Sequence, residues 1–489
     1  MSSLNKHAVL LGIDGMPLDI FPLLFEHGAM PFTKSIWHKF WTSELEVLLP
    51  FTLSSWATIS TGVNPGKHGI FDFIDVTDLN LVTKDKLEYP YINDIVAFNG
   101  LKSITINVPL AYPPFVKRNN IVISSWTEPK PSTWPSDEIK TVKKYVTTTP
   151  YKPNTLDEYI DTLVFSLENR IGLIEEYYVY RDWNFFYTVV PEIDWLFHYL
   201  YGNILRRDKL GKKALKLFKT LDKLIKIMYE NMPDNILLIL CSDHGFTEAH
   251  KSLNINILLK QKGLLKTKED QLPLKSRLIL QLTQIIPQRL KSRLKYSSLI
   301  FAIRRIGISD VFTIEKNPID YENSVVFATI AYNLYINRKL PLSERQRIKA
   351  RVMSILNAYK NMLGKVAYGE KYFWGPYTYR APDIVILPGK GYNISTRLFY
   401  KSVIERGKWY IHSNKGFIAI YQNETNLTKI DSKSLQNTTI APTILIHLGL
   451  PLDPYMDGKT LVNSEVQTRF KTYKILAKIG KKLTRFGFS

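Results

Sequence analysis

Short runs of aliphatic residues recur along the chain, and several of them stop abruptly at polar side chains. The runs at residues 8–13, 185–190 and 236–241 are almost wholly apolar. A run of this length without alternation is too short for a helix and is typical of a strand that is buried on both faces of a sheet. The pattern therefore predicts a buried sheet.

Between these strands, apolar residues recur with helical periodicity. The spacing predicts long helices at 156–180 and 207–229, and Pro and Gly mark the ends of a shorter helix at 17–26. Residues 127–155, rich in Pro, Thr and Lys, are expected to form a surface excursion. With 489 residues, this alternation indicates one large α/β domain with insertions, or two domains. Later elements are expected as helices at 254–265, 341–363 and 441–449, and as strands at 324–330, 334–337 and 381–387.

Polar residues suited to binding a ligand stand where two of the strands end. Asp14 follows the run at 8–13, and Asp243 and His244 follow the run at 236–241. In open α/β sheets the ligand site lies beyond the carboxyl ends of the strands. A carboxylate beside an imidazole suits a divalent ion such as zinc or manganese. An Asp that caps the next helix, beside a His on the surface, explains the pair equally well.

Three further candidate sites are ambiguous when each is taken alone. Thr52 stands at the start of a predicted helix, where free N–H groups favour a phosphoryl group, although Thr is also a common N-cap. Asp194 and His198 stand at i and i+4 on one helical face, where they can bind one ion or form a plain surface pair. His412 is expected in a loop ahead of a strand.

Composition narrows the class of protein. Hydrophobic residues make up 45% of the chain and aromatic residues 12%, which indicates a globular protein. The single cysteine, Cys241, lies in a predicted buried strand, so no internal disulfide framework is possible and a reducing compartment is expected. The polar N-terminus and the lack of an apolar run of about 18 residues predict a cytoplasmic protein that does not span a membrane.

The charge is strongly positive and unevenly distributed. The formal net charge is +21, and residues 271–309 and 466–489 contribute eight and seven basic residues without any acidic residue. A protein of this kind is expected to meet an anionic partner, such as a phosphate compound, nucleic acid or a lipid surface.

The basic segment 466–489 also has an apolar periodicity. A basic amphipathic helix can lie peripherally on an anionic membrane, such as the inner face of the cell membrane. It can equally be a terminal helix that packs on its own domain. The stripe offers no reading surface for nucleic acid, so no specific nucleic-acid binding is predicted. Its apolar residues recur every three or four positions: Phe470, Tyr473, Leu476, Ile479, Leu483 and Phe486.

Taken together and in order, these motifs resemble the alkaline phosphatase superfamily, and most closely its type I phosphodiesterase/nucleotide pyrophosphatase branch. The resemblance runs from about residue 8 to 462 and skips residues 271–309. The matching motifs are the strand that ends in Asp14, residues 52–62 with 65–69, the pair Asp194 and His198, residues 242–245, residues 407–416 around His412, and residues 440–443 with 456–458.

The resemblance implies a three-layer α/β/α sandwich with a mainly parallel central sheet and a helical insertion. It implies a catalytic core at 1–265 and 310–462, a basic helical insertion or cap at 266–309, and a basic amphipathic tail at 463–489. The implied enzyme hydrolyses phosphodiester or pyrophosphate bonds in a phosphate-ester substrate, either a nucleotide or a lipid-linked compound.

The resemblance also implies a two-metal mechanism, with zinc as the expected metal and manganese as the alternative. Two ions roughly 4 Å apart can clamp a phosphoryl group. Thr52 would be the nucleophile and would form a phosphothreonine that is then hydrolysed. The implied ligands are Asp14, Thr52, Asp243 and His244 for one ion, and Asp194, His198 and His412 for the other.

The chain departs from the family pattern near the nucleophile. The family typically reads Thr-Phe-Pro-Asn, whereas this chain reads Thr52-Leu-Ser-Ser55, and Phe73 stands where a phosphate-binding Asn is expected. Ser55 is therefore the candidate for the missing hydrogen bond to substrate. No counterpart of the arginine of alkaline phosphatase is evident, which argues against specialisation for monoesters. A phosphotransferase or phosphomutase of the same superfamily, acting on lipid or sugar phosphates, is the alternative function.

Overall fold

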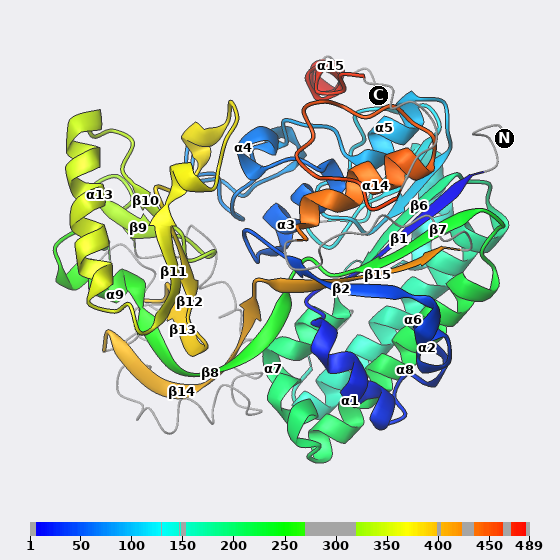
Figure 1. The fold of residues 1–489 in the computed structure, drawn as a ribbon, viewed down its shortest axis with the longest axis horizontal. Coiled ribbons are helices and arrows are strands. Elements are labelled where there is room, and N and C mark those ends of the chain that lie inside the picture. Colours follow the sequence, from blue (N-terminus) through cyan, green and yellow to red (C-terminus); the bar gives the residue numbers. More distant parts are fainter. Residues whose placement is uncertain are drawn as a thin grey trace.

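An eight-stranded sheet forms the centre of the larger lobe in this computed structural model (Figure 1). The structure is described for residues 6–128, 130–145, 147, 153–268, 319–398, 402–422, 435–462 and 471–485. The strand order is β2-β15-β7-β1-β6-β3-β4-β5, and the run β7-β1-β6-β3-β4 is parallel throughout. The strands are β1 (His7–Ile13), β2 (Trp41–Glu46), β3 (Ser103–Ile106), β4 (Asn120–Ile123), β5 (Thr133–Trp134), β6 (Phe185–Val190), β7 (Ile236–Cys241) and β15 (Lys415–Gln422).

Helices cover both faces of this sheet, so the larger lobe has three layers (Figure 1). Val9 and Leu11 of β1 pack into the apolar cluster on one face, and Ala8 and Leu10 pack into the cluster on the other. The predicted α/β/α sandwich with a mainly parallel sheet is confirmed. The helices are α1 (Phe21–Glu26), α2 (Pro31–Ile36), α6 (Leu156–Tyr180), α7 (Glu192–Arg206) and α8 (Lys209–Glu230) on the first face, and α3 (Thr52–Thr61), α5 (Ile92–Phe98), α14 (Ile440–His447) and α15 (Ile475–Arg485) on the second.

A smaller lobe, formed by the described residues between 245 and 413, stands beside the larger one (Figure 1). It has an apolar cluster of its own, which includes Leu258, Leu334 and Val352. The basic segment 271–309 belongs to this part of the sequence but lies outside the described residues. The lobe contains a four-stranded sheet of β9 (Val326–Ala328), β10 (Leu334–Ile336), β11 (Leu363–Tyr368) and β12 (Ile384–Pro388), a three-stranded sheet of β8 (Gly245–Asn254), β13 (Gly391–Ser395) and β14 (Ile404–Ser413), and helices α9 (Ile255–Gln261) and α13 (Leu342–Asn357).

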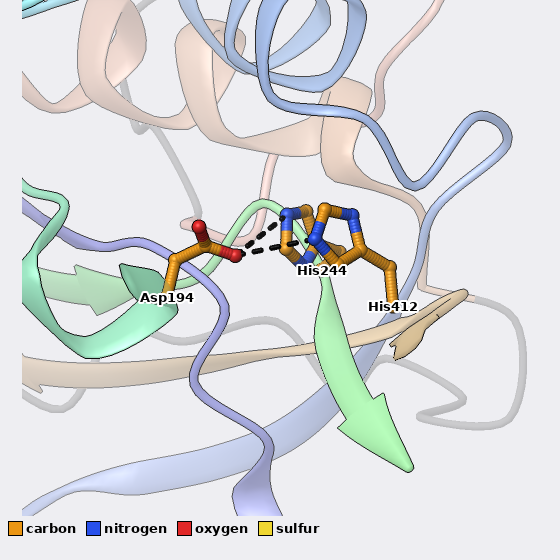
Figure 2. A group of neighbouring side chains, drawn as sticks. All are labelled: Asp194, His244 and His412. Carbon is orange, nitrogen blue, oxygen red and sulfur yellow. Dashed lines mark ion pairs between the residues drawn. The ribbon is translucent and has the colours of Figure 1, made fainter. Parts of the chain in front are cut away.

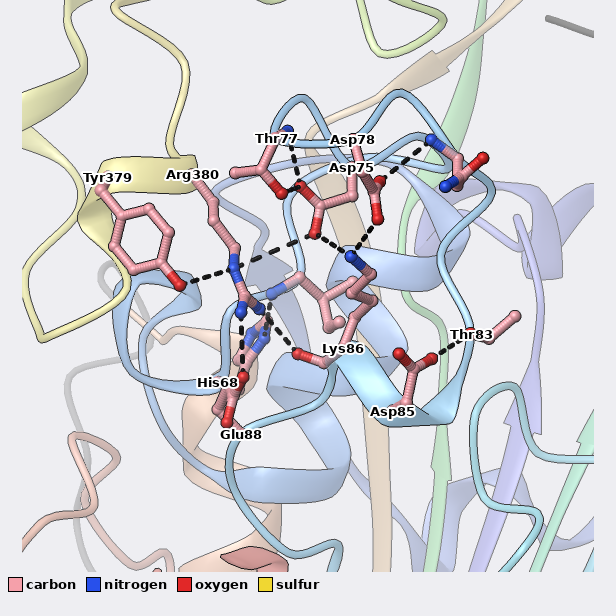
Figure 3. Close-up of polar contacts among 12 residues, drawn as sticks. His68, Asp75, Thr77, Asp78, Thr83, Asp85, Lys86, Glu88, Tyr379 and Arg380 are labelled. Carbon is pink, nitrogen blue, oxygen red and sulfur yellow. Dashed lines mark hydrogen bonds and ion pairs between the residues drawn. The ribbon is translucent and has the colours of Figure 1, made fainter. Parts of the chain in front are cut away.

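Polar contacts join the two lobes, as Figure 3 shows for Arg380. The Arg380 guanidinium donates to the Lys86 carbonyl at 2.9 Å and to Glu88 Oε1 at 3.0 Å. Asp72 of the larger lobe accepts hydrogen bonds from the Ala331 N–H at 3.1 Å and from the Thr329 hydroxyl. The Asp72 contacts fix the turn between β9 and β10 against the segment that follows α3, and the Arg380 contacts join the segment before β12 to residues 86–88.

Four predicted elements are wrong in type or extent, among them the helix predicted at 341–363, since α13 ends at Asn357 and Leu363 begins β11. His412 lies within β14 and not in a loop, because its segment pairs antiparallel with β8. Residues up to Asn254 are strand, so the helix predicted at 254–265 is the shorter α9. The predicted surface excursion at 127–155 contributes β5, which pairs with β4 at the sheet edge.

The C-terminal helix packs on its own domain, and the predicted single stripe is divided between two of its faces. Tyr473 and Leu476 are buried in the larger lobe, whereas Ile479 and Leu483 are 46% and 40% exposed. Phe470 and Phe486 lie outside the described residues. Among the helices of the described ranges, none is both long and apolar enough to cross a membrane.

Candidate metal centre

The candidate residues meet because the strands that carry them are neighbours. Strands β6, β1 and β7 are adjacent and parallel, so their carboxyl ends lie at one edge of the sheet. Asp14 follows β1, Asp243 and His244 follow β7, and α7 with Asp194 and His198 follows β6. His412 of β14 reaches the same edge because it pairs with Phe246 of β8.

Asp194 faces two imidazole rings (Figure 2). Its Oδ1 lies 3.2 Å from His412 Nε2 and 3.9 Å from His244 Nε2. The rings of His244 and His412 are stacked with centroids 3.7 Å apart. One ligand atom from each of these three residues fits within 4.8 Å of the others, which is the spacing needed to hold one ion.

His244 also belongs to a second group of possible ligands. Its Nε2 lies 3.5 Å from Asp14 Oδ1 and 3.4 Å from Asp243 Oδ2, and these three side chains form another group within 4.8 Å. All three are fully buried or nearly so. The two groups share His244, so the structure brings two candidate metal positions side by side.

His198 lies at the outer side of the first group. Its Nε2 is 3.4 Å from Asp194 Oδ2 and 3.1 Å from His412 Nε2, and its side chain is 43% exposed. His412 Nδ1 lies 2.9 Å from the Pro50 carbonyl, which can only accept, so this nitrogen is the one that carries a proton. His412 Nε2 is the ring nitrogen left to face Asp194 and His198, which is the orientation that a metal ligand requires.

Four buried atoms of the cluster have no hydrogen-bond partner among the described residues: Asp14 Oδ1, Asp194 Oδ1, Asp243 Oδ2 and His244 Nε2. Buried polar atoms are nearly always paired, and unpaired ones cost about 1–3 kcal/mol each or more when charged. Three are carboxylate oxygens and one is an imidazole nitrogen, the donor set of a zinc or manganese site. Cations at the two candidate positions would satisfy all four atoms, so the residues present fit a metal centre.

Burial and the neighbouring side chains shift the pKa values of these carboxyl groups in different directions. Burial, together with the charge of Asp194, raises the pKa of Asp243 to about 8. Burial and the nearby Asp243 also raise the pKa of Asp14 well above its usual value. Burial opposes ionisation of Asp194 too, but the imidazoles of His198 and His412 outweigh it and lower that pKa.

Several residues that orient the candidate ligands carried no recognised signal in the sequence. Trp56 Nε1 donates to Asp14 Oδ2 at 3.0 Å, and the Gly15 N–H donates to Asp243 Oδ1 at 3.2 Å. Trp56 lies one helical turn after Thr52, and this position near the predicted nucleophile is the only sign of its role in the sequence.

Thr52 is the first residue of α3 and does not cap it. The N-cap is Phe51, whose side chain makes no capping hydrogen bond, and the Thr52 hydroxyl has no partner among the described residues. Its chain neighbours reach the cluster from both sides, because the Pro50 carbonyl contacts His412 and Trp56 contacts Asp14. The N-cap interpretation is therefore wrong, and Thr52 stays a predicted nucleophile at the N-terminus of α3.

Ser55 has a different role in this structure from the one predicted. Its hydroxyl donates to the Asp243 carbonyl at 2.6 Å and accepts from Asn437 Nδ2 at 3.1 Å. A hydroxyl has one proton, so Ser55 holds the loop of Asp243 in place here. A hydrogen bond from Ser55 to a phosphate stays a prediction. Phe73 packs against the apolar cluster of the larger lobe and offers no polar group.

Solved structures with the same fold are enzymes that act on phosphorus compounds. Phosphonoacetate hydrolase from Sinorhizobium meliloti 1021 in complex with phosphonoformate is 14% identical, with a TM-score of 0.57 over 91% of this chain and 96% of that one. Human ectonucleotide pyrophosphatase/phosphodiesterase 5 is 14% identical, with a TM-score of 0.54 over 93% and 97% of the two chains. A mutant of the alkaline phosphatase PafA is 13% identical, with a TM-score of 0.51 over 94% and 99%.

The family assignment rests on the match between this sequence and a family model. No curated protein matches the chain. The family model of the type I phosphodiesterases/nucleotide pyrophosphatases matches residues 8–416, which covers all of the candidate site residues. The chain therefore belongs to the type I phosphodiesterase/nucleotide pyrophosphatase family, and it is a phosphohydrolase of the alkaline phosphatase superfamily.

Proposed function

We propose that the chain is a two-metal hydrolase of phosphodiester or pyrophosphate bonds, with Thr52 as nucleophile and zinc as the expected metal. The observation that carries this proposal is the set of four buried, unpaired ligand atoms on Asp14, Asp194, Asp243 and His244. Asp14, Thr52, Asp243 and His244 would hold one ion, and Asp194, His198 and His412 the other. When bound, such ions neutralise phosphoryl oxygens and lower the pKa of a hydroxyl nucleophile.

The chain supplies the position and surroundings of the nucleophile. Thr52 begins α3, where unpaired backbone N–H groups and the positive end of the helix dipole favour the phosphoryl group that it attacks. The Thr52 oxygen forms a bond to phosphorus as the bond to the leaving oxygen breaks, and the leaving oxygen takes the electron pair and a proton to replace the one that Thr52 gives up. Water then cleaves the phosphothreonine: its oxygen bonds to phosphorus, one of its protons goes to the Thr52 oxygen, and the phosphomonoester product is released.

Acid quenching of the enzyme during turnover tests the intermediate directly. With a chromogenic diester as substrate, mass spectrometry of a digest is expected to find Thr52 of the wild type carrying the phosphoryl group together with the ester arm that did not leave. Thr52→Ala should lose both the modification and turnover but keep its metal, and Thr52→Ser should keep part of the activity. An alanine variant with most of the wild-type rate would remove Thr52 as nucleophile. Metal analysis of the same wild-type sample should find two ions per chain.

A further inference from the structure

The inward face of α15 is fully accounted for by contacts with its own domain. Leu476 and Ala477 are buried, and a Cβ on Gly480 would lie 2.7 Å from Phe115, so the helix backbone packs closely against the core. Lys481 Nζ lies 2.9 Å from Glu88, the carboxylate that also binds Arg380. The position of α15 on the larger lobe is therefore fixed without its outward face.

The outward face of α15 combines exposed apolar and cationic side chains. Ile475, Ile479 and Leu483 are 55%, 46% and 40% exposed and stand four residues apart, so they form one continuous row. Lys478 and Lys482 form an adjacent exposed row, and neither has an acidic partner in the described residues. No acidic residue occurs between residues 471 and 489.

The outer face of α8 also carries exposed lysines, but it differs from the outward face of α15 because it lacks exposed apolar side chains. This outer face carries Lys212, Lys219 and Lys223, but no large apolar side chain of α8 is exposed. Lysines with no apolar row are typical of a solvated face, whereas an apolar row flanked by lysines suits the boundary between lipid headgroups and acyl chains. Nucleic acid or an acidic protein would explain the lysines but not the exposed isoleucines and leucine.

We propose that the outward face of α15 docks the protein on an anionic lipid surface, with Ile475, Ile479 and Leu483 entering the interface and Lys478 and Lys482 meeting the headgroups. The binding is peripheral, because the inward face stays packed on the domain. It is also separate from the proposed reaction, since α15 contributes no residue to the candidate metal centre.

Co-sedimentation of the full chain with vesicles tests this docking. We expect binding to vesicles of phosphatidylcholine with phosphatidylserine at low salt, and little binding to phosphatidylcholine alone. Each lysine near an anionic surface contributes about a fivefold change in binding. Lys478→Gln with Lys482→Gln should therefore weaken binding about 25-fold, and Ile479→Ser with Leu483→Ser about tenfold or more at unchanged charge.

The matched control is Lys219→Gln with Lys223→Gln on α8, which removes the same charge from the opposite face of the sheet. This control should change binding little. An equal loss in the α8 and α15 variants would show plain charge attraction and overturn the proposal, as would no binding to anionic vesicles or a preference for duplex DNA. Ile479→Trp provides a second readout, because its fluorescence should shift to the blue on vesicle binding; an unchanged spectrum would contradict insertion. Hydrolysis of a soluble diester should be unchanged in all variants, which shows that each is folded.

Discussion

Two carboxylates on α7, Glu192 and Asp194, are buried two residues apart but have opposite surroundings. Glu192 Oε1 accepts hydrogen bonds from Ser166 Oγ at 2.8 Å and from Arg170 Nη2 at 2.9 Å. Arg170 is fully buried and also donates to the Tyr145 hydroxyl. Glu192 thus has a permanent cation from the chain itself, although its second oxygen has no partner among the described residues.

Asp194 has no such cation. It faces the imidazoles of His198, His244 and His412, and it shares its surroundings with Asp14 and Asp243. Burial and the neighbouring carboxylates oppose ionisation of Asp14 and Asp243, and none of the described residues supplies a lysine or arginine partner to them. The difference teaches that burial alone does not mark a functional site, because Arg170 supplies the cation for its own cluster, whereas the Asp194 cluster has buried ligand atoms that a cation from solution would pair.

A substitution in the Asp194 cluster should have the largest effect on activity. We expect Asp243→Asn to lose metal and to lower kcat/KM for a diester by roughly 10²- to 10³-fold or more, the range seen for loss of one preorganised group. Burial and Asp194 oppose ionisation of Asp243, so a neutral amide at this position should leave the melting temperature of the metal-free protein unchanged or raise it. The matched control is Glu192→Gln, which should keep its metal content. Equal metal loss in both variants would erase the contrast between the two clusters.

A substitution in the Arg170 cluster should instead lower the stability of the fold. Arg170→Met leaves Glu192 buried without a cation, which is expected to lower the free energy of unfolding by about 3–5 kcal/mol. Urea denaturation monitored by circular dichroism measures this change. The double variant Arg170→Met with Glu192→Gln should recover most of the loss, because it removes the orphaned charge. A loss below about 1 kcal/mol in the single variant would mean that the pair is not a structural element.

Sequence patterns predicted the residues of the Asp194 cluster and could not predict the Arg170 cluster. Asp14, Asp243 and His244 were found because each interrupts an aliphatic run at the end of a buried strand. Arg170 and Glu192 were not found, because each looks like an ordinary polar residue of an amphipathic helix. Their pairing arises only when α6 packs against α7 and brings residues 22 positions apart into contact.

The extent of β8 shows a second limit of local patterns. Its residues alternate poorly and include Glu248, His250 and Lys251, so no strand was predicted after Phe246. The strand exists because it lies between β13 and β14 and its backbone groups pair on both sides. That pairing also explains why His412 lies on a strand, since only the distant partner segment fixes its conformation.

Removal of metal should destabilise the Asp194 cluster and leave the Arg170 cluster unaffected, so it distinguishes the two clusters. A ligand that binds only the folded state stabilises it by about 4 kcal/mol when its concentration is 1,000 times its dissociation constant. We therefore expect a chelator to lower the melting temperature of the wild type and of Glu192→Gln by similar amounts, and to have little effect on Asp243→Asn. Differential scanning calorimetry with and without chelator measures this. A wild type that melts identically in both conditions would show that the Asp194 cluster needs no cation.

Asp72 is an intermediate case between the two clusters, and it provides the smallest expected effect. This buried carboxylate has hydrogen bonds from Thr329 and from the backbone N–H groups of Phe73 and Ala331, but no cation. Burial outweighs these hydrogen bonds and raises its pKa from 3.8 to about 6. Burial and the charge of Asp72 raise the pKa values of Tyr321 and Tyr335, so these two tyrosines stay neutral in this range.

Because the folded state holds the Asp72 proton more tightly than the unfolded state, this group favours folding most below about pH 4. The contribution is lost as the pH rises to about 6, where both states become ionised, and it amounts to at most about 2.7 kcal/mol for a shift of roughly two pKa units. We expect chelated wild type to lose this much more stability than chelated Asp72→Asn between about pH 4 and pH 7, as measured by urea denaturation at each pH. Subtracting the two curves removes the titration of Asp14 and Asp243, which both proteins share. Parallel curves would show that Asp72 is ionised throughout, and would assign it to the class of compensated carboxylates that Glu192 represents.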